Sequence, residues 1–569
     1  MEKFRRLCFE ILALIITCAI GIVIYFKIKF KYWENRNVPY IEPKIPFGTI
    51  KNPFRSNTVS LGVMAKQQYD EGKRKGYKHV GLYSFTTPAY MPIDLEENKN
   101  ILSRDFSFFP DRGFYNNEKS DPLSAHLFSL EGSKWKILRA KLTSTFTSAK
   151  MKMMFETMSQ CGEQMLEAVD GTFKKRQPID IKDTLARFGT DVIGSCAFGI
   201  DCNSFKNPNS KFRKFTRRVF MRTKFETLKK DFCTAYPSVA RYFRLSKTPT
   251  DVTDFFTNII RETVKRREET KEVRNDFLQI LIDLKNTTGC KKDEQENNLT
   301  IEQVTAQAFL FFIAGFESSS ALMTFCLFEL SQNPKLQEKV RNEINEVLDN
   351  YQAKITYEAV KEMKLLKQVI DETLRKYPPV QILNRKCVMN YKVPGSNFTI
   401  EKGTPIIIPL YGLHYDPQYF PNPEEFNPDR FNEENKQNIL PYTYMPFGEG
   451  PRLCIEETDV TGRHKMEKRA KETTQIIKFF DNLFDSLNGG TFFGGPSKPL
   501  KGVVKRNSPH LSFWKEAICS LRQMFFQTEG TNERRKPPSL TNFISTLVGS
   551  FNLPQLAYAS VRNVTGCGL

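Results

Sequence analysis

Histidine, tryptophan and paired cysteines are scarce in this chain, and each shortage excludes a class of protein. Its 569 residues include only five histidines and three tryptophans. Because the five histidines are scattered, a multi-histidine metal site is not indicated. The twelve cysteines form no Cys-x-x-Cys pair and show no regular spacing, which excludes a disulfide scaffold and a zinc module. A reducing compartment fits this cysteine usage best.

What the chain does have is the composition of a folded protein with a basic excess. Apolar residues make up 40% and charged residues 26%, which excludes a wholly disordered, collagen-like or polytopic membrane protein. Forty-eight phenylalanines indicate a large buried apolar volume. The formal net charge of +20 favours an acidic partner, namely nucleic acid, an anionic membrane face or an acidic protein surface.

One long hydrophobic run, Leu7–Phe26, contains a single charge, Glu10. About 20 apolar residues span the hydrocarbon core of a bilayer as a helix, so residues 1–30 are predicted to form an N-terminal membrane anchor. A cleaved signal peptide is the alternative, because Thr17-Cys18-Ala19 supplies small residues, but the run is long for such a segment. The basic residues that flank the run weakly favour a cytosolic body under the positive-inside rule.

The body that follows the anchor has mainly helical periodicity. A short apolar run near its end, Thr404–Leu410, predicts a β-strand, and the polar stretch Asn286–Asn298 predicts an exposed loop. The predicted helices are Ser133–Phe146, Lys150–Val169, Ile181–Cys196, Asp251–Glu269, Thr300–Ser331 and Thr356–Lys376.

The predicted helix Thr300–Ser331 begins with a capping box, Thr300 to Gln303, and is nearly all apolar in its first half. It is therefore expected to be buried. A second membrane span is disfavoured, because Glu317 and three serines interrupt the apolar run. The stretch Ala314–Ser320 suggests a local opening of the helix that admits a ligand and relays protons; a packing glycine beside a chance run of serines is the alternative.

Two weaker patterns surround this helix. Glu372 and Arg375 stand at i and i+3 on one helical face, and Arg430 could complete a buried Glu–Arg–Arg cluster with them. Trp135 and Arg139 stand at i and i+4, which places an aromatic face beside a cation. Each pattern alone is typical of an ordinary surface helix.

The most specific motif is Phe447-Gly-Glu-Gly-Pro-Arg-Leu-Cys454. Two glycines and a proline predict an irregular loop just before Cys454. Glycines let backbone amides approach a sulfur atom closely, and such hydrogen bonds tune a thiolate. A free cysteine is most often a buried apolar residue, but the Phe-x-x-Gly-x-Arg-x-Cys spacing favours a ligand role here.

Taken in order, these motifs resemble the cytochrome P450 family of haem-thiolate monooxygenases, most closely the insect microsomal type. The resemblance runs from the anchor to Ile455 and includes His126–Trp135 and Arg187–Cys196. It implies a mainly α fold with small β regions, the cytochrome P450 fold with an N-terminal membrane anchor helix, in which residues 31–455 form the haem domain.

The resemblance also implies roles for individual residues. Cys454 would be the proximal haem ligand, and Glu317 with Ser318 would be the acid–alcohol pair that delivers protons to dioxygen, although the family usually has threonine at the position of Ser318. Implied haem contacts are Trp135, Arg139, Arg385, Phe447, Gly450 and Arg452. Glu372, Arg375 and Arg430 would support the proximal side, and Phe106, Phe108, Phe109 and Val380 are candidate walls of a substrate pocket.

The implied partners follow from the same resemblance. Electrons would come from NADPH through the acidic NADPH–cytochrome P450 reductase, with cytochrome b5 as a second candidate donor. The substrate would be an apolar small molecule such as a xenobiotic, an insecticide or a hormone. The chain would lie in the endoplasmic reticulum membrane with its body on the cytosolic face. No recognised motif supports nucleic-acid binding.

The resemblance stops after Ile455, where Glu456 replaces the glycine that the family normally has. Residues 456–569 are a tail of unknown structure, either a genuine replacement C-terminus or a misassembled reading of the gene. The second is favoured because the break falls within two residues of Cys454. Negative charge at Glu456 and Glu457 beside a thiolate disfavours the anionic ligand.

Two rival functions therefore stay open beside the monooxygenase. One is a catalytically dead membrane-bound remnant that acts as a binding or scaffolding protein. The other is a haem enzyme that rearranges peroxides without a reductase, which the presence of both Glu317 and Ser318 argues against.

Overall fold

The computed structural model describes residues 2–50, 59–143, 148–175, 177, 179–274, 276–286 and 299–455. All of them belong to the first of two compact units, Met1–His510. The predicted tail 456–569 and nearly all of the predicted loop Asn286–Asn298 lie outside the described residues.

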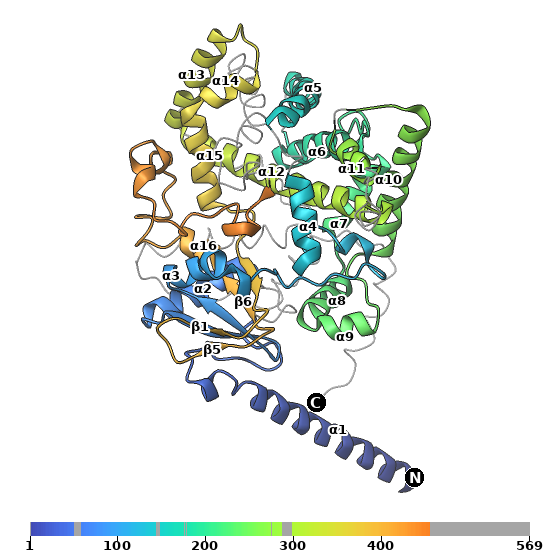
Figure 1. The fold of residues 1–569 in the computed structure, drawn as a ribbon, viewed down its shortest axis with the longest axis vertical. Helices are drawn as coiled ribbons and strands as arrows, with labels where there is room; N and C mark the ends of the chain where they lie inside the picture. The colour runs from blue at the N-terminus through green and yellow to red at the C-terminus, as the bar shows by residue number, and fades with distance from the viewer. Residues whose placement is uncertain are drawn as a thin grey trace, which may run out of the picture. The chain divides into compact units, whose positions relative to one another are not determined.

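Helices dominate the described residues, as the sequence predicts (Figure 1). The longer helices are α1 (Glu2–Lys29), α2 (Leu61–Arg74), α4 (Gly132–Thr143), α5 (Ser148–Lys174), α6 (Ile181–Ile193), α7 (Lys211–Phe220), α8 (Lys224–Ala235), α10 (Thr250–Thr270), α11 (Phe277–Asn286), α12 (Ile301–Gln332), α13 (Pro334–Asn350) and α15 (Lys364–Lys376). The shorter ones are α3 (Leu95–Lys99), α9 (Pro237–Tyr242), α14 (Tyr357–Glu362) and α16 (Leu410–His414).

The larger sheet joins two distant parts of the chain, in the strand order β1-β2-β6-β3. These strands are β1 (His79–Ser84), β2 (Thr87–Pro92), β3 (Leu383–Lys386) and β6 (Pro405–Ile408). β1 and β2 form an antiparallel hairpin, β2 runs parallel to β6 at Tyr90 and Ile406, and β3 pairs antiparallel with β6. The predicted strand at Thr404–Leu410 is thus confirmed as β6. A second sheet holds only β4 (Tyr391–Lys392) and β5 (Thr399–Ile400).

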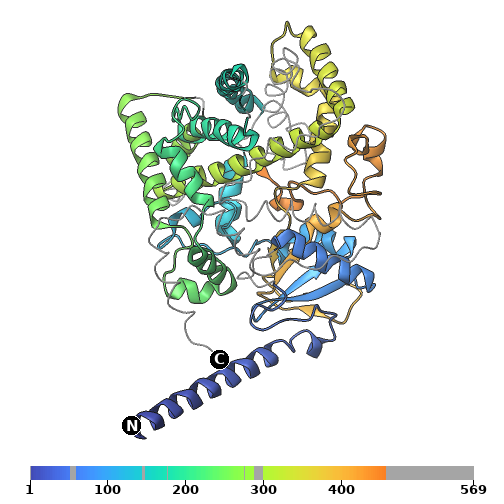
Figure 2. The same ribbon diagram turned by 180° about the vertical axis from the view of Figure 1, so that it is seen from behind.

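Helix α12 lies in the middle of the helical layer, where Figure 2 shows it crossing between α10 and α15. Its predicted capping box is confirmed, because the Thr300 hydroxyl accepts from the Gln303 amide at 3.2 Å and the Gln303 side chain accepts from the Thr300 amide at 3.0 Å. α12 packs against α6, α10, α11 and α15. This packing, and not its length, identifies it as an interior helix.

Length and composition do not separate α12 from a membrane span. Among the described residues, α1 and α12 are both long and apolar enough to cross a bilayer. The sequence argument that Glu317 makes the apolar run of α12 too short was therefore wrong. α1 differs from α12 in that none of its most apolar window is buried, which fits the predicted anchor.

The segment after α1 is tied to the larger sheet. Trp33 has no exposed surface, and its indole nitrogen donates to the Leu82 carbonyl at 2.9 Å. The Tyr83 hydroxyl donates to the Phe30 carbonyl at 2.6 Å. The residues that directly follow the apolar helix are thus fixed to β1 by hydrogen bonds and packing.

Two predicted helices differ from the structure in instructive ways. The predicted helix Thr356–Lys376 is broken at Met363, which has an extended ψ of 83° and a nearly buried side chain. The Glu343 carboxylate of α13 accepts hydrogen bonds from the first amides of α15, so a tertiary contact starts a new helix there. The predicted helix Ile181–Cys196 ends as α6 at Ile193 and continues as a π-helical turn, Gly194–Phe198.

Candidate functional site

Cys454 ends a tight loop that is closed by its own backbone. Its amide donates to the Phe447 carbonyl at 2.9 Å, and the Gly448 amide donates to the Met445 carbonyl at 2.9 Å. Gly450 has a φ of +72°, and a Cβ at this position would lie 2.0 Å from the Leu102 carbonyl oxygen. Glycine is therefore required at 450 by close packing on the segment Asn100–Arg104, a reason different from the predicted approach to sulfur.

Arg452, two residues before Cys454, is buried and reaches into the segment before α4. Its guanidinium donates to the Pro110 carbonyl at 2.7 Å and to the Leu130 carbonyl at 2.9 Å, and it lies 3.3 Å from the Asp111 carboxylate. Its Cζ lies 3.8 Å from the centre of the Trp135 ring. Burial lowers the pKa of Arg452 to about 9, an effect that Asp111 opposes.

Arg452 belongs to a cluster of four arginines, Arg112, Arg139, Arg385 and Arg452. Burial lowers the pKa of Arg112 well below its usual range, and the charges of Arg385, Arg452 and Arg139 lower it further. Burial alone lowers the pKa of Arg385 to about 10. The charge of Cys454, in contrast, raises the pKa of both Arg112 and Arg139, so the Cys454 sulfur lies within electrostatic range of both arginines.

Asp111 lies against Arg452 in this cluster, and the Nε of Arg385 is buried without a hydrogen-bond partner in the described part of the chain. Buried cations are normally paired, so the cluster is suited to an anionic ligand. Haem carries two propionate carboxylates, and Cys454 could offer its iron a thiolate. The residues present therefore fit haem.

Sequence reasoning missed Arg112 as a member of this cluster. Arg112 donates to the Arg452 carbonyl at 2.7 Å and lies over the Phe128 ring at 4.2 Å. It lies in a loop, outside any helical spacing or motif, so only the fold brings it beside Cys454. Of the predicted haem contacts, Arg139, Arg385 and Arg452 belong to this cluster, and Trp135 packs against it.

The midpoint of α12 combines exposed and enclosed groups. Glu317 is exposed, although α12 is an interior helix. Desolvation by the surrounding protein nevertheless raises the pKa of the Glu317 carboxyl, and the charge of Lys182 on α6 opposes this shift. The Ser318 hydroxyl donates to the Ala314 carbonyl one turn back.

The glycine of this stretch has a packing role. A Cβ on Gly315 would lie 2.7 Å from Cδ1 of Ile193, so glycine allows α6 to approach α12 closely. α12 is helical without a break from Ile301 to Gln332. The predicted local opening of the helix is therefore wrong, and the alternative of a packing glycine accounts for the sequence.

The structure brings Glu372, Arg375 and Arg430 together. The first two have no exposed surface and form a bidentate pair, with Nε and Nη2 of Arg375 at 2.7 and 2.8 Å from the carboxylate oxygens. The Nε of Arg430 lies 3.5 Å from Glu372. Arg375 also donates to the carbonyls of His414 and Pro423, so the cluster joins α15 to the segment that precedes the Cys454 loop.

The four candidate pocket residues are not gathered in one place. Phe106 packs near Trp135, with ring centres 6.0 Å apart, whereas Phe108 and Phe109 pack edge-on against Tyr391. Phe109 has no exposed surface and Val380 is 43% exposed. Their role as pocket walls stays a prediction.

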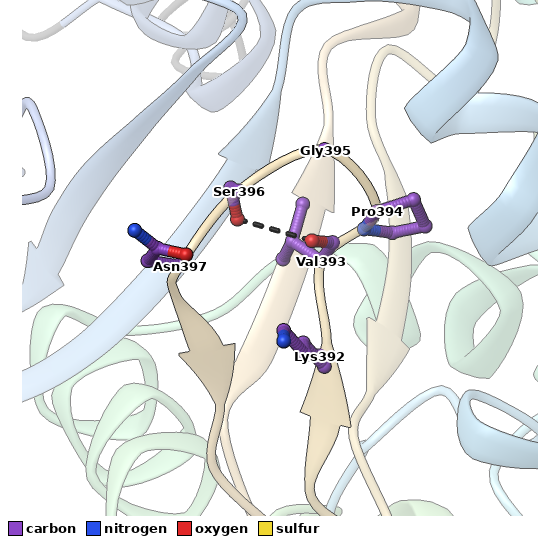
Figure 3. A pocket seen from close by; sticks show the side chains of 6 residues that line it. All are labelled: Lys392, Val393, Pro394, Gly395, Ser396 and Asn397. Atoms are coloured by element: carbon purple, nitrogen blue, oxygen red, sulfur yellow. Dashed lines mark hydrogen bonds between the residues drawn. The ribbon is translucent and has the colours of Figure 1, made fainter.

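Two surface concavities lie elsewhere and include none of the predicted site residues. The larger, of about 430 Å³, is the turn Lys392–Asn397 between β4 and β5, shown in Figure 3, where the Ser396 hydroxyl donates to the Val393 carbonyl at 3.1 Å. The smaller, of about 200 Å³, lies between α5 and the π-helical turn and is lined by Glu156, Cys196 and Arg274 among others.

Comparison with known proteins gives the family. The cytochrome P450 family profile matches residues 46–457. The chain is 41% identical over 430 residues to the probable cytochrome P450 6a18 of Drosophila melanogaster, which covers 75% of this chain and 84% of the relative. It is 40% identical over 441 residues to cytochrome P450 6A1 of Musca domestica, covering 76% and 86%. The chain thus belongs to the cytochrome P450 family of haem-containing monooxygenases, and it is an oxidoreductase of that family.

Proposed function

We propose that this chain is a membrane-anchored monooxygenase that inserts one oxygen atom of O₂ into an apolar small molecule, with electrons from NADPH through a reductase. The observation that supports this most strongly is the arginine cluster beside Cys454, in which Arg385 and Arg452 are buried. It would supply cationic partners for a dianionic cofactor next to a thiolate ligand.

Cys454 would be the thiolate ligand of haem, and the four arginines with Trp135 would hold its propionates. Phe447 and Gly450 would shape the loop that carries the thiolate. Bound haem would supply the reductive activation of dioxygen. A thiolate ligand favours cleavage of the O–O bond, which is the chemistry that oxygen insertion needs.

Glu317 and Ser318 would hold and pass protons at the midpoint of α12. Burial raises the pKa of the Glu317 carboxyl, which keeps its proton available at a higher pH than in a free side chain. The Ser318 hydroxyl donates to Ala314 and can rotate to a second acceptor. Glu372, Arg375 and Arg430 would have a structural role, because they contact the segments that lead to the Cys454 loop.

The proposed setting is the endoplasmic reticulum membrane, with α1 as the anchor and the body on the cytosolic face. The apolar, unburied α1 supports membrane attachment. The net charge of +20 suits an acidic reductase, with cytochrome b5 as a second electron donor. Proposed substrates are xenobiotics, insecticides or hormones of apolar character, with Phe106, Phe108, Phe109 and Val380 as candidate walls.

A dead remnant is the second candidate, because the chain departs from the family profile after residue 457, close to Cys454. The test is turnover by the full chain in lipid nanodiscs with purified reductase, NADPH, O₂ and an apolar probe substrate. Oxygenated product that depends on reductase and disappears in Cys454→Ala supports the monooxygenase. A folded chain that forms no product under these conditions supports the remnant.

A further inference from the structure

One buried histidine connects α15 to the Cys454 loop, defined here as Thr443–Cys454. His414, the last residue of α16 (Figure 1), has no exposed surface. Its Nδ1 lies 3.1 Å from the Arg375 carbonyl oxygen, and its Nε2 lies 3.1 Å from the Met445 amide nitrogen. Its own carbonyl accepts from Arg375 at 2.9 Å. The side chain thus spans two segments that are about 70 residues apart in the chain.

The hydrogen-bond partners of His414 determine which ring nitrogen carries the proton. A carbonyl oxygen can only accept, so Nδ1 carries the hydrogen, and a backbone amide can only donate, so Nε2 offers its lone pair. The ring is therefore neutral in the one tautomer that satisfies both bonds. Burial, followed by the charge of Arg375, lowers the pKa of His414 to about 3. The imidazole consequently keeps this tautomer across the physiological range.

Two backbone hydrogen bonds within the loop lie between Met445 and Cys454. The Met445 carbonyl accepts from the Gly448 amide, and the Phe447 carbonyl accepts from the Cys454 amide, both at 2.9 Å. The His414 ring also lies nearly parallel to the Tyr444 ring at 5.4 Å, and the Tyr444 hydroxyl donates to the Asp371 carbonyl of α15 at 2.9 Å. The start of the loop is therefore held from α16 and α15 together.

We propose that His414 is a positioning residue that fixes the start of the Cys454 loop and so holds the Cys454 sulfur in place. Loss of its two hydrogen bonds leaves the Met445 amide and the Arg375 carbonyl unpaired in a buried site, which favours states in which the loop moves away. The inference rests on the proposed function only in taking Cys454 as the cofactor ligand. The His414 side chain bonds to Arg375 and Met445 and not to Cys454, so it acts through the loop.

The first test is amide hydrogen exchange in full-length His414→Phe. Phenylalanine keeps the stacking on Tyr444 and removes both hydrogen bonds. The matched control is His79→Phe, since His79 is nearly buried, hydrogen-bonded to Glu97 at 2.9 Å and packed at a tilt against the Tyr90 ring, but lies on β1. Exchange at Met445 should rise about five- to ten-fold in His414→Phe, as expected for one lost hydrogen bond, and stay unchanged in the control.

The second test measures alkylation of Cys454 by iodoacetamide in the haem-free fraction of the same proteins, followed by peptide mass spectrometry. His414→Phe should raise the rate several-fold, and His79→Phe should leave it at the wild-type value. Equal rates in wild type and His414→Phe, or an equal rise in both variants, would overturn the proposal. Because neither readout needs bound haem or turnover, failure of the proposed function would not imitate this result.

A wild-type measurement covers the case in which His414→Phe does not fold. The titratable and charged groups that face His414 are Arg375 from α15 and Tyr444 from the loop. Neither titrates between pH 5 and 8 in its ordinary range. Protection of the Met445 amide, corrected for intrinsic exchange, should therefore be constant from pH 5 to 8. A Met445 amide without protection anywhere in this range would show that His414 does not form this bridge, and a loss of protection toward pH 5 would contradict its fixed neutral tautomer.

Discussion

The guanidinium of Arg452 lies over the Trp135 ring, with Cζ 3.8 Å from the ring centre. Both side chains are nearly buried, so the stack joins the Cys454 loop to α4 at the candidate haem site. Spacing within α4 predicts Arg139 as the cation beside Trp135, and the cation found over its ring comes from a segment more than 300 residues later. Four arginines then share this small volume.

Arg385→Met should have opposite effects on the haem-free and the haem-bound protein. Without an anion, removal of one crowded guanidinium relieves like-charge repulsion, so the thermal midpoint should stay the same or rise. With haem, one partner of the propionates is lost, so haem affinity should fall about ten-fold or more. Differential scanning fluorimetry and haem titration measure the two quantities.

The matched control is Lys392→Met, which removes an exposed charge on β4. It should change neither quantity. A haem-free Arg385→Met protein that is clearly less stable than wild type would contradict the view that the cluster is over-charged.

Glu372→Gln should destabilise the protein by about 3–5 kcal/mol, because it leaves Arg375 buried without its carboxylate. Urea unfolding followed by circular dichroism measures this change. Glu433→Gln removes a carboxylate from the exposed pair with Lys364 and should leave the midpoint unchanged. If the two variants unfold alike, the buried pair does not support the fold as described.

Glu317→Gln should stabilise the protein at neutral pH and have no effect at strongly acid pH. Burial raises the pKa of the folded carboxyl, so between its usual value and the raised value the folded state holds a proton that the unfolded state has lost. Stability from this group therefore falls as the pH rises through that window. Thermal midpoints of both proteins from pH 4 to 8 should diverge with rising pH; parallel curves would count against the shift.

Lys182→Met should raise the pKa of Glu317 further, because Lys182 is the charge that opposes the effect of burial. In the Lys182→Met background, Glu317→Gln should therefore diverge from its parent up to a higher pH and reach a larger final difference in stability, while the onset of the divergence stays the same. The same set of melting curves checks this, and an unchanged final difference would show that the two side chains do not interact.

Ser318→Thr should reduce the release of hydrogen peroxide per NADPH consumed. Serine and threonine share the hydroxyl that donates to Ala314, but the β-branched side chain of threonine has fewer χ1 rotamers. A better-fixed hydroxyl should couple electron use to product formation more tightly. Peroxide and NADPH are measured together with saturating reductase, and an unchanged ratio would refute this role of the serine.

Local patterns predicted long helices such as α5, α10 and α12, because their signals lie within the helices themselves. The capping box at Thr300 set the start of α12, and the i, i+3 spacing anticipated the contact of Glu372 with Arg375. The break at Met363 was not predictable, since it depends on Glu343 from another helix. Arg112 and His414 were missed as members of the site for the same reason, as each meets the Cys454 loop only through the fold.

The reduced carbon-monoxide difference spectrum of the purified full chain tests the central claim most directly. The account predicts the red-shifted Soret band of thiolate-ligated haem, present in the wild-type chain and lost in Cys454→Ala. A folded chain that shows no such band, or a Cys454→Ala variant that keeps it, would contradict the assignment of Cys454 as the haem ligand.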